Sequence, residues 1–296
     1  MGWAAWPAAI LLFAACTGGT SLIERSPDAG GTQPARVRKA SFRLAVIGDF
    51  GTGEAAERAV ADEIRARREH LDALLTTGDN VYPSGDPDEF RSAWVQPYGW
   101  VARSGLNVVA SLGNHDVRTD DGRPVMRLLS IPNEWYHEVI GDADIFVLDA
   151  NRPDDAQQLR WLREALARAS GAWSIAVFHQ PAYTCGEYRG DARIQQRWVP
   201  LFERFGVDLV LNGHDHNYQR FAAVKGVTYV VSGGGGNSNL YPLEECPESY
   251  PERLVGNARA HHFLLVEGSS RRLSLRAITD GGRVIDAFTL RSGSTG

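Results

Sequence analysis

The sequence lacks several features that would place it directly in a functional class. It has no excess of positive charge, since 31 Lys and Arg residues are outnumbered by 36 Asp and Glu residues and the formal net charge is −5. A phosphate backbone requires a basic surface, so this balance argues against nucleic acid as a specific partner. Metal ions could still supply local positive charge for a small phosphorylated ligand. The chain has no internal repeat of solenoid period, and the run Gly233 to Gly236 is not followed by the Gly-Lys-Ser/Thr of a P-loop.

Long hydrophobic runs are also missing. The run from Ala8 to Ala15 is much shorter than the roughly 20 apolar residues of a membrane-spanning helix, so we interpret residues 1–16 as a signal peptide. The stretch Phe13 to Cys16 resembles the lipid-attachment box of bacterial lipoproteins, although no Lys or Arg precedes the apolar run. We expect an exported protein, either secreted or held at the cell envelope through a lipid on Cys16. Residues 17–40 are rich in Gly, Pro, Thr and Ser without apolar periodicity, which predicts a flexible tether.

Cysteine is scarce, with three residues in the chain. Apart from Cys16, the two thiols are Cys185 and Cys246. A pair of thiols in an oxidising compartment often forms a disulfide, so we predict a bond between them. Two separate buried cysteines are the alternative.

The remainder of the chain alternates between two kinds of pattern. Short apolar runs, each long enough for a buried strand, occur at 44–47, 73–75, 108–112, 145–148, 175–178 and 209–211. Helical patterns lie between some of them, at 54–69, 157–169 and 194–205. After Arg220 the segments 227–231, 262–266, 273–278 and 284–290 resemble antiparallel strands separated by turn residues. No linker follows Ser41, so residues 41–296 are predicted to form a single α/β domain of two packed mixed sheets flanked by helices.

Five of the apolar runs are followed by residue types that bind metals. The groups, in chain order, are Gly48-Asp49, Gly78-Asp79-Asn80-Val81-Tyr82, Gly113-Asn114-His115-Asp116, His179 and Gly213-His214-Asp215-His216. Ligands of open α/β sheets bind beyond the carboxyl ends of the strands, so these groups should converge on one site. Each motif alone is weak, because a Gly-Asp after a strand is more often a turn. Their joint occurrence at consecutive strand ends predicts a metal site.

This ordered series resembles the signature of the metallophosphoesterase superfamily, also called calcineurin-like. Within that superfamily, a tyrosine three residues after the second aspartate is typical of purple acid phosphatases, and Tyr82 has this spacing from Asp79. No separate β-domain precedes Asp49, so the chain is most similar to the short, tartrate-resistant type. The resemblance implies the αββα sandwich of the superfamily.

The same resemblance implies a dinuclear metal centre whose two ligand sets share Asp79. The set for Fe(III) consists of Asp49, Asp79, Tyr82 and His216, and the set for Fe(II), Zn(II) or Mn(II) consists of Asp79, Asn114, His179 and His214. Oxygen donors suit Fe(III), and mixed nitrogen and oxygen donors suit a divalent ion. The cations also offset the charge of buried carboxylates that would otherwise be costly.

The implied reaction is in-line attack on phosphorus by a metal-activated hydroxide. Asn114 and His115 would bind the phosphate, and His115, oriented by Asp116, would protonate the leaving alkoxide. The loop 180–191 lacks the second histidine of the tartrate-resistant type. Arg189 in this loop either binds phosphate or is solvated.

The sequence thus predicts an acid phosphatase that acts on small phosphomonoesters as a monomer. A phosphodiesterase or nucleotidase of the same superfamily is the first alternative, since the motifs do not define the substrate pocket. A metal-binding lipoprotein without catalysis is the second, and His115 argues against it because a binding protein needs no proton donor. Asn217 and Tyr218, which follow the last motif, either line the site or pack in the core.

Overall fold

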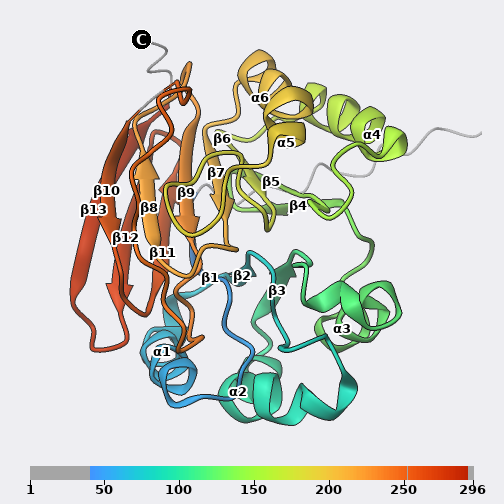
Figure 1. Ribbon diagram of the computed structural model, residues 1–296, viewed down its shortest axis with the longest axis vertical. Coiled ribbons are helices and arrows are strands. Elements are labelled where there is room, and N and C mark those ends of the chain that lie inside the picture. Colours follow the sequence, from blue (N-terminus) through green and yellow to red (C-terminus); the bar gives the residue numbers. More distant parts are fainter. Residues whose placement is uncertain (1–40, 252, 293–296) are drawn as a thin grey trace, which may run out of the picture. The chain divides into compact units, whose positions relative to one another are not determined.

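The apolar runs form the strands of two sheets (Figure 1). In the computed structural model, which describes residues 41–251 and 253–292, the first sheet has six strands in the order β13-β12-β11-β1-β2-β3. Their bounds are β1 Phe42–Ile47, β2 Ala73–Thr76, β3 Asn107–Ala110, β11 His262–Ser269, β12 Arg272–Thr279 and β13 Val284–Arg291. Strands β1, β2 and β3 are parallel, and β11, β12 and β13 extend the sheet in antiparallel pairings from the other side of β1.

The second sheet has seven strands in the order β10-β8-β9-β7-β6-β5-β4. Their bounds are β4 Tyr136–Ile140, β5 Ala143–Val147, β6 Trp173–Val177, β7 Leu209–Asn212, β8 Tyr218–Phe221, β9 Thr228–Ser232 and β10 Leu254–Ala258. Strands β5, β6, β7 and β9 are parallel, whereas β4, β8 and β10 pair antiparallel with their neighbours. All ten predicted strands are present, and β4, β8 and β10 are additional.

The two sheets pack face to face and helices cover their outer surfaces. Along β1, Leu44 and Val46 belong to the core between the sheets, whereas Ala45 and Ile47 pack toward the helices, as the alternation of a strand requires. Helices α1 Ala55–Arg65, α2 Gln96–Ser104 and α3 Arg123–Leu129 contribute to the core on the first sheet, and α4 Ala156–Ala167, α5 Ala192–Arg197 and α6 Val199–Phe205 to that on the second. Figure 1 shows the two helical layers at opposite ends of the view, with the sheets between them. The predicted αββα sandwich is confirmed.

The helix predicted for 194–205 is interrupted. It forms as α5 and α6, which meet at Trp198, and Pro200 lies in the first turn of α6. Proline has no N–H, so a continuous helix would lose its bond to the carbonyl of Gln196. Helices α2 and α3 were not predicted from the sequence.

The N-terminal segment falls outside the described residues. The signal peptide predicted for 1–16, the lipid site at Cys16 and the tether predicted for 17–40 all lie there. Within the described ranges, no helix has the length and apolar character needed to cross a membrane.

Candidate metal centre

The predicted ligand residues lie together at the carboxyl ends of parallel strands. Asp49 follows β1, Asp79 follows β2, Asn114 follows β3, His179 follows β6 and His214 follows β7. Since β1, β2 and β3 belong to one sheet and β6 and β7 to the other, neither sheet carries the whole group. The packing of the two sheets therefore creates the site.

Tight turns hold the ligands at these strand ends. Asp49, Asp79 and His214 have positive φ angles of 56°, 53° and 74°. Such conformations cost about 1–3 kcal/mol each in non-glycine residues and concentrate at functional sites. A Cβ atom at Gly113 would lie 2.1 Å from Asp79 Oδ1, and one at Gly213 would lie 2.4 Å from Asp49 Oδ2. The glycines of the motifs thus allow the backbone of one loop to approach the carboxylate of another.

The first set of donors surrounds the Tyr82 hydroxyl. Tyr82 Oη lies 2.9 Å from Asp79 Oδ2, 3.3 Å from Asp49 Oδ1 and 3.1 Å from His216 Nε2. His216 Nε2 and Asp49 Oδ1 are 3.5 Å apart. These four side chains are the residues predicted to bind Fe(III).

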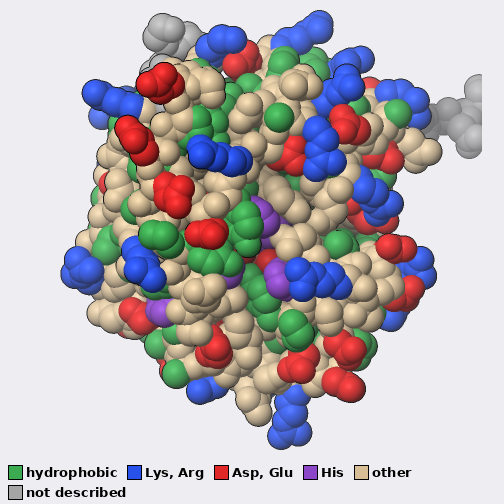
Figure 2. All heavy atoms as spheres, viewed as in Figure 1, with side chains coloured by type: hydrophobic (Ala, Val, Ile, Leu, Met, Phe, Trp, Pro, Cys, Tyr) green, Lys and Arg blue, Asp and Glu red, His purple; other side chains and the backbone are tan. Residues whose placement is uncertain are grey.

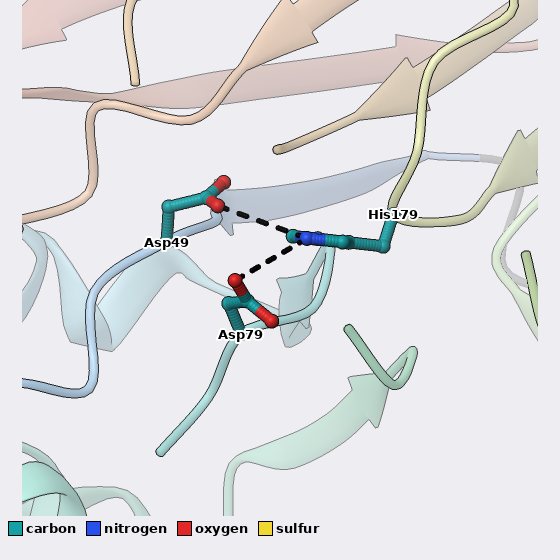
Figure 3. Close-up of side chains that lie close together, drawn as sticks. All are labelled: Asp49, Asp79 and His179. Carbon is teal, nitrogen blue, oxygen red and sulfur yellow. Dashed lines mark ion pairs between the residues drawn. The ribbon is translucent and has the colours of Figure 1, made fainter. Parts of the chain in front are cut away.

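The second set of donors surrounds the Asn114 amide oxygen. Asn114 Oδ1 lies 3.1 Å from His179 Nε2 and 3.0 Å from His214 Nδ1. His179 Nε2 is 3.3 Å from Asp79 Oδ2, so this oxygen belongs to both sets. Figure 3 shows the His179 ring directed at the carboxylates of Asp49 and Asp79, and these three buried residues offer ligand atoms that lie within 4.8 Å of one another.

The orientation of the imidazoles fits a bound cation. His179 Nδ1 lies 2.9 Å from the Thr77 carbonyl and His216 Nδ1 lies 2.8 Å from the Asn239 carbonyl. A proton on each Nδ1 satisfies these carbonyls and leaves the Nε2 lone pairs pointing into the site. His179 Nε2 and His214 Nδ1 then face each other at 3.3 Å, next to the Asn114 oxygen. A cation satisfies such converging acceptors better than any hydrogen bond among them.

The electrostatics of the site also require positive charge. The side chains of Asp49 and Asp79 are almost completely buried. Burial disfavours the charged form of His179, but the carboxylates of Asp79 and Asp49 outweigh it and raise the pKa of His179 to about 9. Burial and the charge of His179 lower the pKa of His214 to about 3. Burial and the same two carboxylates raise the pKa of Tyr82 well above its usual value, so a phenolate here needs a neighbouring cation.

His115 lies at the rim, but the expectation that Asp116 orients it is wrong. The Asp116 carboxylate is buried and accepts hydrogen bonds from the backbone N–H groups of Asn80, Val81 and Gly113 at 2.8–3.1 Å. It therefore ties the loop after β2 to the loop after β3. The His115 ring instead places Nδ1 2.8 Å from the Pro83 carbonyl.

Arg118 is a site residue that the sequence interpretation missed. Its guanidinium lies 3.3 Å from His115 Nε2 and donates to the Pro83 carbonyl at 3.1 Å. Among the described residues, no carboxylate lies within ion-pair distance of it. The only signal in the sequence was its position two residues after the Gly-Asn-His-Asp motif. Figure 2 shows histidine side chains reaching the surface at the centre of this face, between hydrophobic and basic side chains.

The loop after His179 is held by a disulfide between Cys185 and Cys246, the pair that the sequence suggested. Arg189 lies in this loop and is exposed, and none of the described hydrogen bonds joins its guanidinium to the ligand group. Tyr218 belongs to β8 and packs in the core between the sheets, where its hydroxyl donates to Asp286 at 2.7 Å. Of the two open alternatives for Tyr218, core packing is the observed one.

Comparison with known proteins agrees with this geometry. Human tartrate-resistant acid phosphatase type 5 (Homo sapiens) is 26% identical over 295 residues, which cover 82% of this chain and 89% of the human protein. The solved structure of purple acid phosphatase PPD1 from yellow lupin (Lupinus luteus) seeds has a TM-score of 0.72 at 19% identity and covers 86% of this chain and 54% of the lupin chain. GAP50, the anchor in the inner membrane complex of Plasmodium, has a TM-score of 0.73 at 19% identity and covers 87% of this chain and 90% of its own.

The two similar structures are evidence for the fold alone, because their sequence identities to this chain are low. The family model for calcineurin-like phosphoesterases matches residues 42–218, which is more than half of the chain. This range includes every predicted ligand residue. The chain therefore belongs to the calcineurin-like phosphoesterase family and is similar, within it, to the purple acid phosphatases.

Proposed function

We propose that this chain is an acid phosphatase that hydrolyses phosphomonoesters at a dinuclear metal centre. One observation carries the proposal: two sets of four donors share Asp79 Oδ2, and one of them contains the Tyr82 hydroxyl. A structural metal site needs one closed set of ligands, whereas two overlapping sets are suited to two ions that act on one substrate. The similarity to tartrate-resistant acid phosphatases supports the same activity.

The donor chemistry suggests which ion each set would hold. The set with Asp49, Asp79 and Tyr82 is rich in oxygen donors and suits Fe(III). The set with His179, His214 and the Asn114 amide suits Fe(II), Zn(II) or Mn(II). When bound, the two cations would supply Lewis acidity, which acidifies a water molecule and offsets charge on the phosphoryl oxygens.

The surrounding side chains would bind the phosphate and supply a proton. His115 Nε2 lies 4.0 Å from Asp79 Oδ2, so it reaches a phosphate held at the centre. The Pro83 carbonyl accepts from His115 Nδ1 and fixes the ring with Nε2 toward the site. We propose that the Arg118 guanidinium binds the phosphate oxygens in place of His115 Nε2. His115 Nε2 is then free to carry the proton for the leaving alkoxide. Arg189 is a second phosphate contact in this proposal.

We also propose that the protein acts outside the cytoplasm. The Cys185–Cys246 disulfide supports an oxidising compartment. The N-terminal segment suggests export, followed by either secretion or anchoring through a lipid on Cys16.

The activity can be tested with chromogenic substrates. The metal-free protein would be loaded with Fe(III) together with Fe(II), Zn(II) or Mn(II), and assayed with 4-nitrophenyl phosphate, bis(4-nitrophenyl) phosphate and a nucleoside monophosphate at acid and neutral pH. We expect the aryl monoester to be hydrolysed fastest, at acid pH. Faster cleavage of the diester or of the nucleotide would indicate the phosphodiesterase or nucleotidase, and metal binding without hydrolysis would indicate a binding protein.

A further inference from the structure

Two tyrosines that no motif includes cover the outer faces of two ligand histidines. The Tyr188 ring stacks on His214, with centroids 4.2 Å apart and planes inclined by 27°. The Tyr241 ring stacks on His216 at 4.2 Å and 9°. The two tyrosine rings meet edge to face at 5.6 Å and 80°. They form a corner of aromatic surface beside the candidate metal centre, which we call the aromatic corner.

The Tyr188 ring is exposed although one of its faces is covered. Tyr188 as a whole residue is 40% exposed, which makes it one of few large apolar residues with so much open surface in the part of the chain that the structure describes. An aromatic ring that lines an active site and keeps an open face can stack on a flat group of a ligand. The hydrophobic surface beside the histidines is visible at the centre of the face in Figure 2.

The chain holds the aromatic corner firmly in place. The Tyr188 N–H donates to Asp215 Oδ1 at 3.3 Å, and the Tyr241 N–H donates to the His216 carbonyl at 3.1 Å. Each tyrosine is thereby tied to the backbone or side chain of the His214–His216 segment. A preorganised wall loses little conformational entropy when a ligand binds, so most of the free energy of its contacts with the ligand contributes to the binding affinity.

The disulfide clamps together the two loops that carry these rings. Cys185 lies three residues before Tyr188, in the loop after β6, and Cys246 lies five residues after Tyr241, in the segment after β9. The Glu244 N–H also donates to the Cys185 carbonyl at 2.7 Å. The covalent link therefore restricts the relative movement of the two loops from which the rings come.

We propose that the aromatic corner binds the leaving group of the substrate and makes the enzyme selective for phosphoesters with a flat aromatic group over saturated ones of the same size. The proposal rests on the proposed phosphatase function, because it assumes that the phosphate lies at the metal centre. Stacking on one or two rings predicts a preference of roughly 3- to 10-fold. Tyr188 and Tyr241 act here as specificity residues and take no part in bond breaking.

A binding experiment tests the proposal independently of turnover. Titration calorimetry of the metal-loaded protein would compare benzylphosphonate with cyclohexylmethylphosphonate, which are not hydrolysed and carry a flat aromatic ring and a saturated six-membered ring, respectively. We expect the wild type to bind the benzyl compound roughly 3- to 10-fold more tightly. Tyr188→Leu, which keeps bulk but removes the ring, should bring the ratio close to one, whereas Tyr188→Phe should retain it. Tyr241→Leu provides a second variant for the same ratio.

Turnover of the corresponding esters gives the second measurement. Benzyl phosphate and cyclohexylmethyl phosphate have leaving groups of similar basicity, so the ratio of their kcat/KM values reports how the leaving group is bound. Tyr188→Leu should lower this ratio roughly 3- to 10-fold, mainly through a higher KM for the benzyl ester. Equal affinity of the wild type for both phosphonates would overturn the proposed role of the aromatic corner. An equal loss of affinity for both phosphonates in Tyr188→Leu would do the same. If the protein binds the benzyl phosphonate selectively but hydrolyses no ester, the proposed role of the aromatic corner stands and the proposed phosphatase activity is refuted.

Discussion

The two sheets contribute different donor atoms to the candidate centre. The loops of the first sheet, after β1, β2 and β3, supply oxygen donors from Asp49, Asp79, Tyr82 and Asn114. The loops of the second sheet, after β6 and β7, supply imidazole nitrogens from His179, His214 and His216. We call these groups the oxygen half and the nitrogen half. The oxygen half carries the negative charge that demands cations, and the nitrogen half completes each set with imidazole donors.

The two halves are also held in different ways. In the oxygen half, buried Asp116 links two loops through hydrogen bonds to Asn80, Val81 and Gly113. In the nitrogen half, Asp215 accepts from Thr184 Oγ1 and from the Tyr188 N–H, and a disulfide reinforces the same loop. Within the described residues, the only disulfide lies in the nitrogen half. A buried carboxylate thus joins two loops by hydrogen bonds in each half, and a covalent cross-link is added in the nitrogen half.

The largest difference between the halves is expected in metal content. Asp79→Ala should lose both ions and all measurable activity, since Asp79 Oδ2 is the donor that the two sets share. His214→Ala removes a nitrogen donor from one set and should lose one ion. Elemental analysis of the two purified variants, each compared with the wild type, measures this directly. Near-normal content of both metals in Asp79→Ala would contradict the shared ligand.

Removal of the His115 side chain should lower the rate of catalysis without removing the metal ions of either donor set. His115→Ala should keep both metals, because its ring is not a proposed ligand, and its kcat for alkyl phosphates should fall about 10²- to 10⁴-fold. The loss should be smaller for aryl phosphates, whose leaving groups need less help from a proton. A series of esters with graded leaving-group basicity measures the difference. If the loss is uniform across the series, His115 is not the proton donor.

The linking carboxylates should differ in their contribution to stability. Asp116→Ala leaves several buried N–H groups without an acceptor, at a cost of about 4 kcal/mol, whereas Asp215→Ala leaves fewer and should cost about 2 kcal/mol because the disulfide remains. Urea unfolding of the metal-free variants gives both values. Should Asp116→Ala fail to fold, Asp116→Asn would show the same order with a smaller difference. Equal costs would remove the distinction between the halves.

The smallest effect on the fold is expected from the Tyr82 hydroxyl. Tyr82→Phe keeps the ring but removes the donor oxygen, so stability should change by less than about 1 kcal/mol. A phenolate beside Fe(III) gives a visible charge-transfer band, and the iron-loaded variant should lose it while Asp49, Asp79 and His216 retain the ion. Absorbance spectra of iron-loaded wild type and variant test this. A colourless wild type, or a variant with the band intact, would rule out Tyr82 as a ligand.

The sequence was sufficient for the parts of the molecule that local pattern encodes. Each ligand group follows an apolar run, and all but His179 also follow a glycine, so Asp49, Asp79, Asn114, His179 and His214 could be found without coordinates. The fully buried strands could also be recognised in the sequence as continuous apolar runs, since both of their faces are apolar. Strand β4 could not be found in this way, because the adjacent polar residues His137 and Glu138 interrupt both an apolar run and a regular alternation. The split between α5 and α6 could have been predicted from Pro200.

The sequence by itself determined the strands, the ligand residues and their order, because each depends on neighbours along the chain. Only the tertiary structure decided that Asp116 links two loops instead of orienting His115, and that Arg118 contacts the His115 ring. The same is true of Tyr188 and Tyr241, which meet over the histidines although they lie on separate loops. Hydrogen bonds and ring contacts of this kind depend on how two sheets pack and where their loops end in space. No local pattern of residues records that arrangement.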